Sequence, residues 1–464
     1  MTLAGPIVMK FGGTSVADAD AIARVVGIVK GARESSGLPP VVIVSAMSGV
    51  TDRLLELTQA AEQRRDAHVL NGVADLSRRH FEAVERLLPP ESSTGVLAEI
   101  AAQLDDLRAL LKATGILRAA SPSAHDAIVC TGEIMSSRIL AAALQQAGVA
   151  TAWVDARCTI VTDGAHTGAA PLGPETRDAV ARQIVPRVAE GRVPVLGGFV
   201  GATIQGVTTT LGRGGSDYSA AIVGAALDAR EIQIWTDVDG MLTADPRVVA
   251  HPRVVPHLSF GEASELAYFG AKVLHPSTIL PAVAKDIPVR ILNSRRADGR
   301  GTTITAEPPA ADRPLAAVAC KRHVTMVEIT STRMLMAHGF LRRVFEIFER
   351  YRTAVDVVTT SEVSVSVTVD DARALEGIVT ALREFAEVSV EADLAILCAV
   401  GDNLRSDPRI AARVIGTLEG FRVRMVSQAA SRRNVTIVLS DADLGAAMAQ
   451  LHEEFFQEVG VRSS

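Results

Sequence analysis

Charged side chains that suit phosphate and carboxylate chemistry stand among glycines between residues 197 and 221. The centre of this stretch reads Gly212-Arg213-Gly214-Gly215-Ser216-Asp217, between a short apolar strand and a helix of small residues. Glycine lets the backbone approach a ligand closely, and the free N–H groups at a helix start attract anions. The guanidinium group of Arg213 adds several N–H donors that can bind a carboxylate or phosphate. This pattern favours a ligand-binding loop over the alternative, a tight turn capped by Ser216 or Asp217.

The loop matches neither of two common phosphate-binding motifs. Residues 201–206 have the glycine spacing of a P-loop, but Val207 and Thr208 follow where Lys and Ser or Thr are required. Asp217 stands where a dinucleotide fingerprint has its third glycine. A lysine for phosphate must therefore come from elsewhere in the chain.

Lys10 is the candidate for that lysine. It lies at the exit of a short apolar strand and is followed closely by Gly12 and Gly13. A lysine beside glycine amides is well placed to hold transferring phosphates, whereas the alternative is a surface lysine at a strand end. Both interpretations remain open on this segment alone.

Further polar groups are expected at the ends of other strands. Residues 40–44 predict a buried strand that opens into the small polar loop Ser45–Thr51. We expect a strand to end near Ile128–Cys130, with Glu133 opening the next helix. Glu133 either binds a ligand or serves as a favourable partner for the helix dipole.

The elements that must position these groups alternate between strand and helix. Across residues 1–305 this alternation predicts an α/β fold with a mainly parallel sheet covered by helices on both faces. Residues 52–117 read as a helical insertion. Ligands of such sheets bind at the carboxyl ends of the strands. The residues expected at these strand ends are Lys10, Ser45, Glu133, Gly198 and Asp237.

The C-terminal part has a different pattern. Residues 307–314 read as a linker, and two βαββαβ-like rounds of about 70 residues follow. The second round lacks an opening strand of its own, and strand 315–320 is a candidate for that place.

Composition narrows the classes of function. The 464 residues carry a formal net charge of −6, which argues against a nucleic-acid or anionic membrane partner. The four cysteines are far apart, and the N-terminus has no apolar signal core, so we expect a reducing, cytoplasmic location.

Four motifs follow one another along the chain: KFGGTSVAD at 10–18, TTTLGRGGSD at 208–217, TDVDG with ADPR at 236–247, and FGAKVLHP at 269–276. Together they resemble the aspartate kinases (aspartokinases) of the amino-acid kinase superfamily. The C-terminal part resembles the paired ACT modules of that family. The segments ITSTRMLMAHGFLRRVFEIF and VDVVTTSEVSV are most similar to its lysine-sensitive, single-function branch.

The resemblance implies an amino-acid kinase fold over 1–305, a linker and first ACT (ferredoxin-like) module over 306–393, and a second ACT module over 394–464. It implies ATP-dependent phosphorylation of the β-carboxylate of L-aspartate to 4-phospho-L-aspartate. This reaction is the first step towards lysine, threonine and methionine, with feedback through the ACT modules. An aspartate carboxylate, with a pKa of about 3.9, is ionised at neutral pH, so no general base is needed. The reaction needs charge neutralisation and in-line alignment instead.

Carried over by motif, the resemblance implies catalytic roles for Lys10, Arg213 and Asp217. For aspartate binding it implies Ser45, Thr51, Glu133, Arg213, Gly214, Gly215 and Ser216. For ATP it implies Lys10, Phe11, Gly12, Gly13, Thr236, Asp237, Leu242, Arg247, Lys272 and Val273. For an amino-acid effector it implies Met334, Gly339, Phe340, Leu341, Asp356, Ser361, Glu362 and Val363. Mg²⁺ is expected mainly on the ATP phosphates, without a metal site made by the protein alone.

Three residues depart from the family pattern. Leu242 stands where relatives carry an aromatic residue beside the nucleotide, and Met336 and Ala337 stand where lysine-sensitive relatives show His and Ser. The loss of two hydrogen-bonding groups predicts that lysine is still favoured over threonine but binds more weakly than in relatives.

The expected partners are L-aspartate, ATP, an amino-acid effector and a second copy of the chain. The resemblance implies a homodimer through residues 315–464, or a tetramer built from two such dimers. Two other functions remain as alternatives. One is a kinase of another carboxylate such as acetylglutamate, which Glu133 disfavours because an acetylated amine carries no charge. The other is a catalytically silent amino-acid sensor, which the intact charged residues disfavour. A fusion to homoserine dehydrogenase is not expected.

Overall fold

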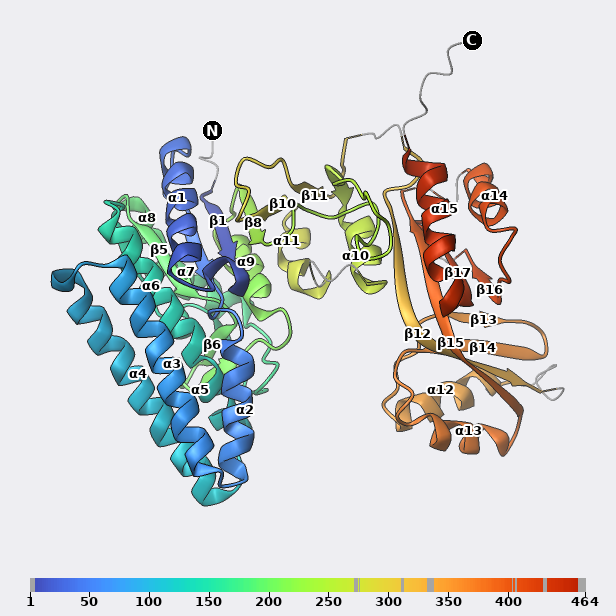
Figure 1. Ribbon diagram of the computed structural model, residues 1–464, viewed down its shortest axis with the longest axis horizontal. Helices are drawn as coiled ribbons and strands as arrows, with labels where there is room; N and C mark the ends of the chain where they lie inside the picture. The colour runs from blue at the N-terminus through green and yellow to red at the C-terminus, as the bar shows by residue number, and fades with distance from the viewer. Residues whose placement is uncertain are drawn as a thin grey trace, which may run out of the picture. The chain divides into compact units, whose positions relative to one another are not determined.

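The computed structural model describes residues 5–457, with gaps at 271–273, 275, 310–312, 332–337, 403, 405–406 and 429–431. The chain divides into two compact units (Figure 1). The first contains residues 1–241 and 273–308, and the second contains 242–272 and 309–464. Residues 242–272, which the sequence analysis placed in the kinase domain, therefore group with the C-terminal part. The domain boundaries at 305 and 393 stay a prediction.

A parallel sheet forms the centre of the first unit. Its strands lie in the order β3, β5, β2, β1, β8, β10, β11, and every described pair is parallel except β10–β11. Their bounds are β1 Ile7–Phe11, β2 Val41–Val44, β3 Thr151–Trp153, β5 Val193–Gly197, β8 Glu231–Thr236, β10 Val289–Asn293 and β11 Thr302–Thr305. All residues of β1 and β2 are buried, as expected for strands covered on both faces. The predicted mainly parallel sheet is confirmed.

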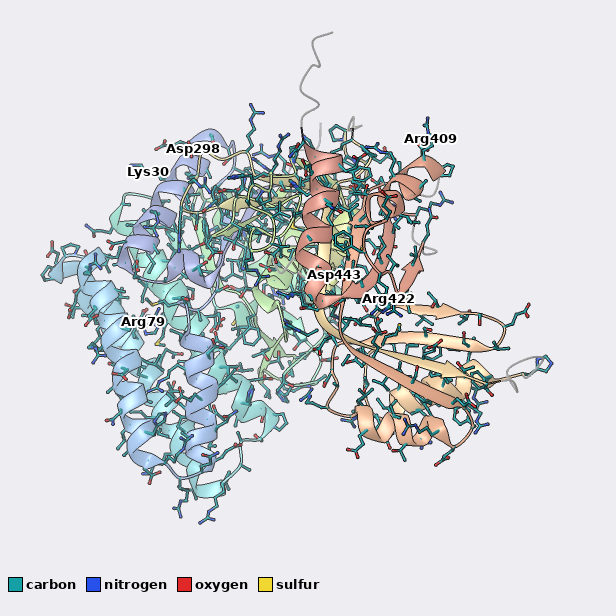
Figure 2. All side chains as sticks on the ribbon, turned by 45° about the vertical axis from the view of Figure 1, so that its right-hand side comes forward. Lys30, Arg79, Asp298, Arg409, Arg422 and Asp443 are labelled. Carbon is teal, nitrogen blue, oxygen red and sulfur yellow. The ribbon has the colours of Figure 1, made fainter. Side chains whose placement is uncertain are left out.

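Helices pack on this sheet and extend beyond it. The helix α6 contacts β3 and β5, and α9 contacts β1 and β8. Charged side chains such as Lys30 project from the outer face of α1 (Figure 2). The bounds of these elements are α1 Ala19–Ser35, α6 Thr131–Gln146, α7 Gly173–Gln183, α8 Val185–Ala189, α9 Gly215–Ala226 and α11 Leu280–Ala284.

The predicted helical insertion is a bundle of long helices. It comprises α2 Val50–Glu62, α3 Asp66–Leu87 and α4 Pro90–Leu117, followed by the short α5 Pro122–Val129. Leucines and alanines of these helices join the same hydrophobic core as the sheet. The insertion therefore supports the sheet edge from which the site loops emerge.

The strand expected at Ile128–Cys130 is wrong. These residues end α5, and Cys130 keeps a helical backbone before α6 begins at Thr131. Ser121 caps α5 and Pro122 occupies its first turn, so a helix is already established when the apolar residues arrive. A short apolar run does not distinguish a buried strand from a buried helix. The stretch Pro122–Gln146 is long and apolar enough to span a membrane, but most of it is buried in the protein core.

A second, small sheet lies within the first unit. Its strands are β4 Val161–Thr162, β6 Val200–Thr203 and β7 Thr208–Thr210, in that order. The strand β6 pairs parallel with β4 and antiparallel with β7. Because β7 leads directly into the glycine-rich loop, this small sheet fixes where that loop starts.

The second unit is built on an antiparallel sheet with the order β13, β14, β12, β15, β17, β16. The strand bounds are β12 Ala317–Thr330, β13 Val358–Thr360, β14 Ser364–Val369, β15 Glu387–Val400, β16 Met425–Ser427 and β17 Asn434–Ser440. The other elements are β9 His257–Ser259, α10 Phe260–Tyr268, α12 Phe340–Arg350, α13 Leu375–Arg383, α14 Pro408–Thr417 and α15 Leu444–Phe456.

Two long strands run through both rounds of the second unit. Residues 325–330 of β12 pair with β14 and with the first half of β15, beside the core that contains α12 and α13. Residues 317–321 of β12 pair with the second half of β15, which in turn pairs with β17. The start of β12 thus lies with the strands of the second round, where the sequence showed no opening strand.

Candidate active site

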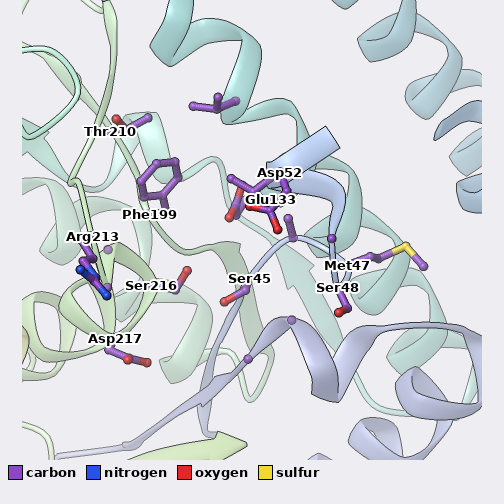
Figure 3. A pocket seen from close by; sticks show the side chains of 18 of the residues that line it. Ser45, Met47, Ser48, Asp52, Glu133, Phe199, Thr210, Arg213, Ser216 and Asp217 are labelled. Atoms are coloured by element: carbon purple, nitrogen blue, oxygen red, sulfur yellow. The ribbon is translucent and has the colours of Figure 1, made fainter. Parts of the chain in front are cut away.

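A cavity of about 690 Å³ opens at the carboxyl ends of the central strands of the first unit. Residues from the ends of β1, β2 and β8, the start of α6 and the glycine-rich loop line it together. In the view of Figure 3, Ser45 and Ser216 lie between Arg213 and Glu133. The sheet therefore gathers polar groups from segments that are far apart in the sequence.

Lys10 and Asp217 form an ion pair in this cavity. The Lys10 Nζ lies 2.6 Å from Oδ1 of Asp217, and the two side chains are only 10% and 14% exposed. Lys10 is the fourth residue of β1, and Asp217 lies in the first turn of α9. A largely buried charge is stable only with a partner. The pair consequently fixes the lysine ammonium in one place at the edge of the cavity.

Two glycines bring the loop and the strands close together. A Cβ at Gly198 would lie 2.7 Å from the Cβ of Ser216, so only glycine allows the end of β5 to approach α9 this closely. Gly214 precedes the first residue of α9 and has a φ of 72°, a conformation that glycine adopts without strain. The start of α9, with Gly215 and Ser216, therefore lines the cavity next to Arg213.

Arg213 stands on this loop with an exposed guanidinium. Within the described part of the chain, it forms no ion pair with an acid and lines the cavity with its side chain. An unpaired guanidinium at the rim of a polar cavity suits a bidentate contact to a carboxylate or a phosphate.

Glu133 is the buried acid of the site. It lies in the first turn of α6 and is 3% exposed. Its Oε2 has no hydrogen-bond partner among the described residues. Burial raises the pKa of Glu133 to about 8, although a hydrogen bond from the Ala46 backbone and the charge of Lys10 act in the opposite direction. A buried carboxyl with a free oxygen can accept a ligand ammonium group.

Most residues implied for substrate and phosphate binding come together here. The cavity is lined by Lys10, Gly12, Gly13, Ser45, Thr51, Glu133, Arg213, Gly214, Gly215, Ser216, Asp217, Thr236 and Asp237. Phe11 does not line it, because its ring is fully buried and stacks on Trp235 at a centroid distance of 5.9 Å. Leu242 and Arg247 belong to the second unit, where Arg247 pairs with Asp245 at 2.6 Å. Lys272 and Val273 lie outside the described residues.

Comparison with known proteins identifies the family. The model of the amino acid kinase family matches residues 5–293, and an ACT domain model matches residues 397–455. The lysine-sensitive aspartokinase 3 of Escherichia coli is 36% identical over 462 residues, which cover 97% of this chain and 99% of that protein. The chain belongs to the aspartokinases.

Other aspartokinases support this assignment. The chloroplastic aspartokinase 3 of Arabidopsis thaliana is 37% identical and covers 97% of this chain and 81% of its own length. The crystal structure of E. coli aspartokinase III with aspartate and ADP superposes with a TM-score of 0.81 at 35% identity, covering 97% and 100% of the two chains. The structure of the same enzyme with lysine and aspartate gives a TM-score of 0.82 at the same identity and coverage. The predicted kinase fold followed by ACT modules is confirmed.

The aspartokinase cavity also contains residues to which the sequence assigned no role. Thr14, Asp52, Leu55, His125, Val129, Thr167, Phe199 and Thr210 line it, as do Ala46, Met47, Ser48, Gly49 and Gly212 from the two loops that the sequence marked. Thr167 and Phe199 have positive φ angles of 69° and 67°. Such backbone outliers in non-glycine residues cluster at functional sites. No local pattern in the sequence marks them, since their conformations depend on distant partners.

The residues implied for an effector are spread over the second unit of this aspartokinase. Asp356 precedes β13, whereas Ser361, Glu362 and Val363 form the turn between β13 and β14. Asp356 and the turn therefore lie at opposite ends of one hairpin, with roughly 13 Å of strand between Asp356 and Thr360.

The remaining effector residues lie at the start of α12. Gly339 precedes that helix with a φ of 87°, Phe340 is buried in its core, and Leu341 is exposed. Met334 lies outside the described residues, as do Met336 and Ala337.

No group of three or more His, Cys, Asp or Glu side chains is arranged to hold a metal ion in the described part of the chain. The charged lining of the cavity instead combines Lys10 and Arg213 with four acids, Asp52, Glu133, Asp217 and Asp237. The two cations suit the anionic oxygen atoms of a ligand.

Proposed function

We propose that this aspartokinase transfers the γ-phosphoryl group of ATP to the β-carboxylate of L-aspartate and releases ADP and 4-phospho-L-aspartate. The observation that carries the proposal is one cavity in which the Lys10–Asp217 pair, Arg213 and Glu133 all meet. The crystal structure of the similar E. coli enzyme with aspartate and ADP supports the same pair of ligands.

Acceptor recognition follows from two opposite charges. The free Oε2 of Glu133 accepts a hydrogen bond from the α-ammonium group of aspartate, and the Arg213 guanidinium donates to a carboxylate. Ser45, Thr51 and Ser216 line the cavity between them. An acceptor without a charged amine leaves Glu133 unsatisfied, so this geometry disfavours an acetylated amino acid.

The phosphoryl transfer needs charge neutralisation and an in-line alignment of the attacking and leaving oxygen atoms. A β-carboxylate oxygen of aspartate attacks the γ-phosphorus, and the bond to the bridging oxygen of ADP breaks with both electrons going to ADP. Lys10, held by Asp217, neutralises charge on the transferring group. Gly12 and Gly13 allow the nucleotide phosphates to lie close to the backbone. Mg²⁺ bound to the ATP oxygens would supply further charge neutralisation.

Formation of aspartyl hydroxamate tests this function directly. Wild-type enzyme, ATP, Mg²⁺ and L-aspartate with hydroxylamine should yield the hydroxamate, because hydroxylamine captures the acyl phosphate. Product with acetylglutamate but none with aspartate would favour another acceptor. No product with either, despite ADP binding, would favour a silent amino-acid sensor.

Regulation and assembly are part of the same proposal. Feedback acts through the ACT modules, with lysine as the expected effector, as the lysine complex of the E. coli enzyme suggests. A homodimer through residues 315–464 would cover exposed apolar side chains of the second unit, such as Phe345 and Val358. All four cysteines are free, which fits the proposed cytoplasmic location.

A further inference from the structure

Asp126 is a fully buried acid that lies beside the cavity without lining it. It is part of α5, and its carboxylate accepts hydrogen bonds from two other segments. The Thr210 hydroxyl donates at 2.6 Å, the Thr167 N–H lies 3.1 Å from both oxygens, and Nδ1 of His166 lies at 2.8 Å. One carboxylate therefore ties together α5, the loop 163–170 and the end of β7.

The bond to Thr167 holds a strained backbone. Thr167 has a φ of 69°, and a β-branched residue is a genuine outlier in this region. Such a conformation is unfavourable and persists only where its surroundings enforce it. Asp126 accepts a hydrogen bond from the N–H of this same residue, so the buried carboxylate is bonded directly to the strained backbone.

Thr167 in turn lies against the turn that carries Arg213. A Cβ at Gly212 would lie 3.3 Å from the carbonyl oxygen of Thr167 and from Cα of Gly168. Gly212 itself has a φ of 73°. The Ala169 N–H also donates to the Thr210 carbonyl at 2.9 Å, so the loop runs beside β7 up to this turn. The Thr167 backbone is therefore packed directly against the turn at Gly212.

We propose that Asp126 is a positioning residue for acceptor binding. It holds Thr167 in the left-handed conformation and Thr210 at the end of β7, and together these residues fix the turn from which Arg213 projects. The proposal rests on the proposed contact between Arg213 and the acceptor carboxylate. It assigns no contact between Asp126 and aspartate itself.

Asp126→Asn tests this role, because the amide keeps the shape but replaces one acceptor oxygen with a donor. The expected result is a KM for aspartate raised about tenfold or more, because the turn that carries Arg213 loses the bonds that hold it. The KM for ATP and kcat should change much less, because Lys10 and the nucleotide side stay in place.

A second substitution distinguishes positioning from general packing. Glycine adopts a positive φ without strain, so Thr167→Gly added to Asp126→Asn should recover much of the lost aspartate affinity. Thr209→Val is the matched control. Thr209 precedes Thr210 on β7, and its buried hydroxyl bonds to Thr162 at 2.7 Å instead of to Asp126. This variant should lose stability and keep its KM for aspartate.

Two results would overturn the proposal. One is an unchanged KM in folded Asp126→Asn enzyme, and the other is a raised KM that Thr167→Gly fails to lower. If Asp126→Asn does not accumulate as folded enzyme, Thr210→Val removes one of the same bonds, and an unchanged KM for aspartate then has the same meaning.

Amide hydrogen exchange separates this proposal from the proposed function. Without any substrate, the peptide covering residues 163–170 should exchange faster in Asp126→Asn than in wild type. Equal exchange in the two proteins would overturn the positioning role. Wild-type enzyme that forms no aspartyl hydroxamate would instead count against the proposed function, whatever the exchange shows.

Discussion

The Lys321 ammonium lies 2.6 Å from a carboxylate oxygen of Asp356, the acid implied for effector binding. The Asp356 side chain is only 2% exposed, and the Tyr268 hydroxyl donates to the same oxygen at 3.3 Å. Burial raises the pKa of Asp356, and the hydrogen bond from Lys321 offsets part of this effect. This acid, which would attract the amine of a bound lysine, is therefore already paired with a lysine of its own chain.

An effector amine must compete with Lys321 for Asp356. Lys321→Met should therefore strengthen inhibition by free lysine several-fold, while Asp356→Ala should weaken it. The measurement is an inhibition titration with lysine, threonine and methionine on wild type and both variants. Arg322→Met is the matched control, because the neighbouring Arg322 pairs with Asp441 instead.

Two outcomes would contradict this competition. Inhibition constants that are equal in Lys321→Met and wild type would show that the effector amine does not use Asp356. Millimolar lysine without effect on wild type would remove the lysine assignment and leave the kinase activity untouched.

Lys10→Met should lower kcat on the order of 10²–10³-fold or more, because its charge matters most as the phosphoryl group separates. The KM values should change less. Steady-state kinetics of the hydroxamate assay measure both. Lys30→Met, on the exposed face of α1, is the control and should match wild type. Near-native turnover of Lys10→Met would show that another group neutralises the phosphate.

Aspartate binding should depend on pH through Glu133. Because its pKa is about 8, the Glu133 carboxyl is largely protonated at neutral pH when the site is empty. An ammonium ligand needs the ionised carboxylate. The KM for aspartate should fall by about tenfold per pH unit as pH rises towards 8, and then level off. Glu133→Gln should raise this KM strongly and remove the pH dependence.

The same pKa predicts the stability of the ligand-free protein. The pKa of folded Glu133 is raised above its ordinary value of 4.5. Between pH 4.5 and 8 the folded state therefore keeps a proton that the unfolded chain releases, so stability falls as pH rises through this window. Glu133→Gln should melt at a higher temperature than wild type at pH 8, with a smaller difference at pH 5.

Glu91→Gln is the control for both measurements on Glu133. Glu91 also lies in the first turn of a helix, α4, but outside the cavity. If Glu91→Gln changed the KM for aspartate and the melting temperature as Glu133→Gln does, Glu133 would act only as a partner of the helix dipole.

Assembly should depend on the exposed apolar residues of the second unit. Phe345 on α12 and Val358 on the edge strand β13 are 38% and 37% exposed, and such edges are commonly closed by another copy. Sedimentation velocity of the full chain should show a dimer or larger, and Phe345→Glu with Val358→Glu should shift it to monomer. Leu70→Glu, an exposed residue of α3, should leave the assembly intact. A wild-type monomer at micromolar concentration would argue against this interface.

The sequence predicts the site best where chemistry and backbone requirements are local. Lys10, Arg213 and Asp217 each lie within two residues of a glycine, near the end of a strand or the start of a helix, so residue type and spacing together indicate their roles. The parallel sheet can be predicted equally well, because its strands are short, rich in β-branched residues and bounded by polar loops.

Residues whose partners are distant leave no such pattern. Asp126 lies 40 and 84 residues from His166 and Thr210, and in the sequence it is an ordinary acid near a proline. Asp356 looks like an exposed strand carboxylate until the pairing of β12 places Lys321 beside it. The strand predicted at Ile128–Cys130 is wrong because three apolar residues fit a buried strand and a buried helix equally well.

The two long strands of the C-terminal sheet have a consequence for truncated proteins. Because β12 and β15 each serve both rounds, a cut between residues 393 and 394 passes through β15. Either fragment would expose unpaired N–H and C=O groups along the interrupted strands, which favours aggregation. The C-terminal unit should accordingly melt in one cooperative transition, and a shortened gene that stops after the first round should yield insoluble product.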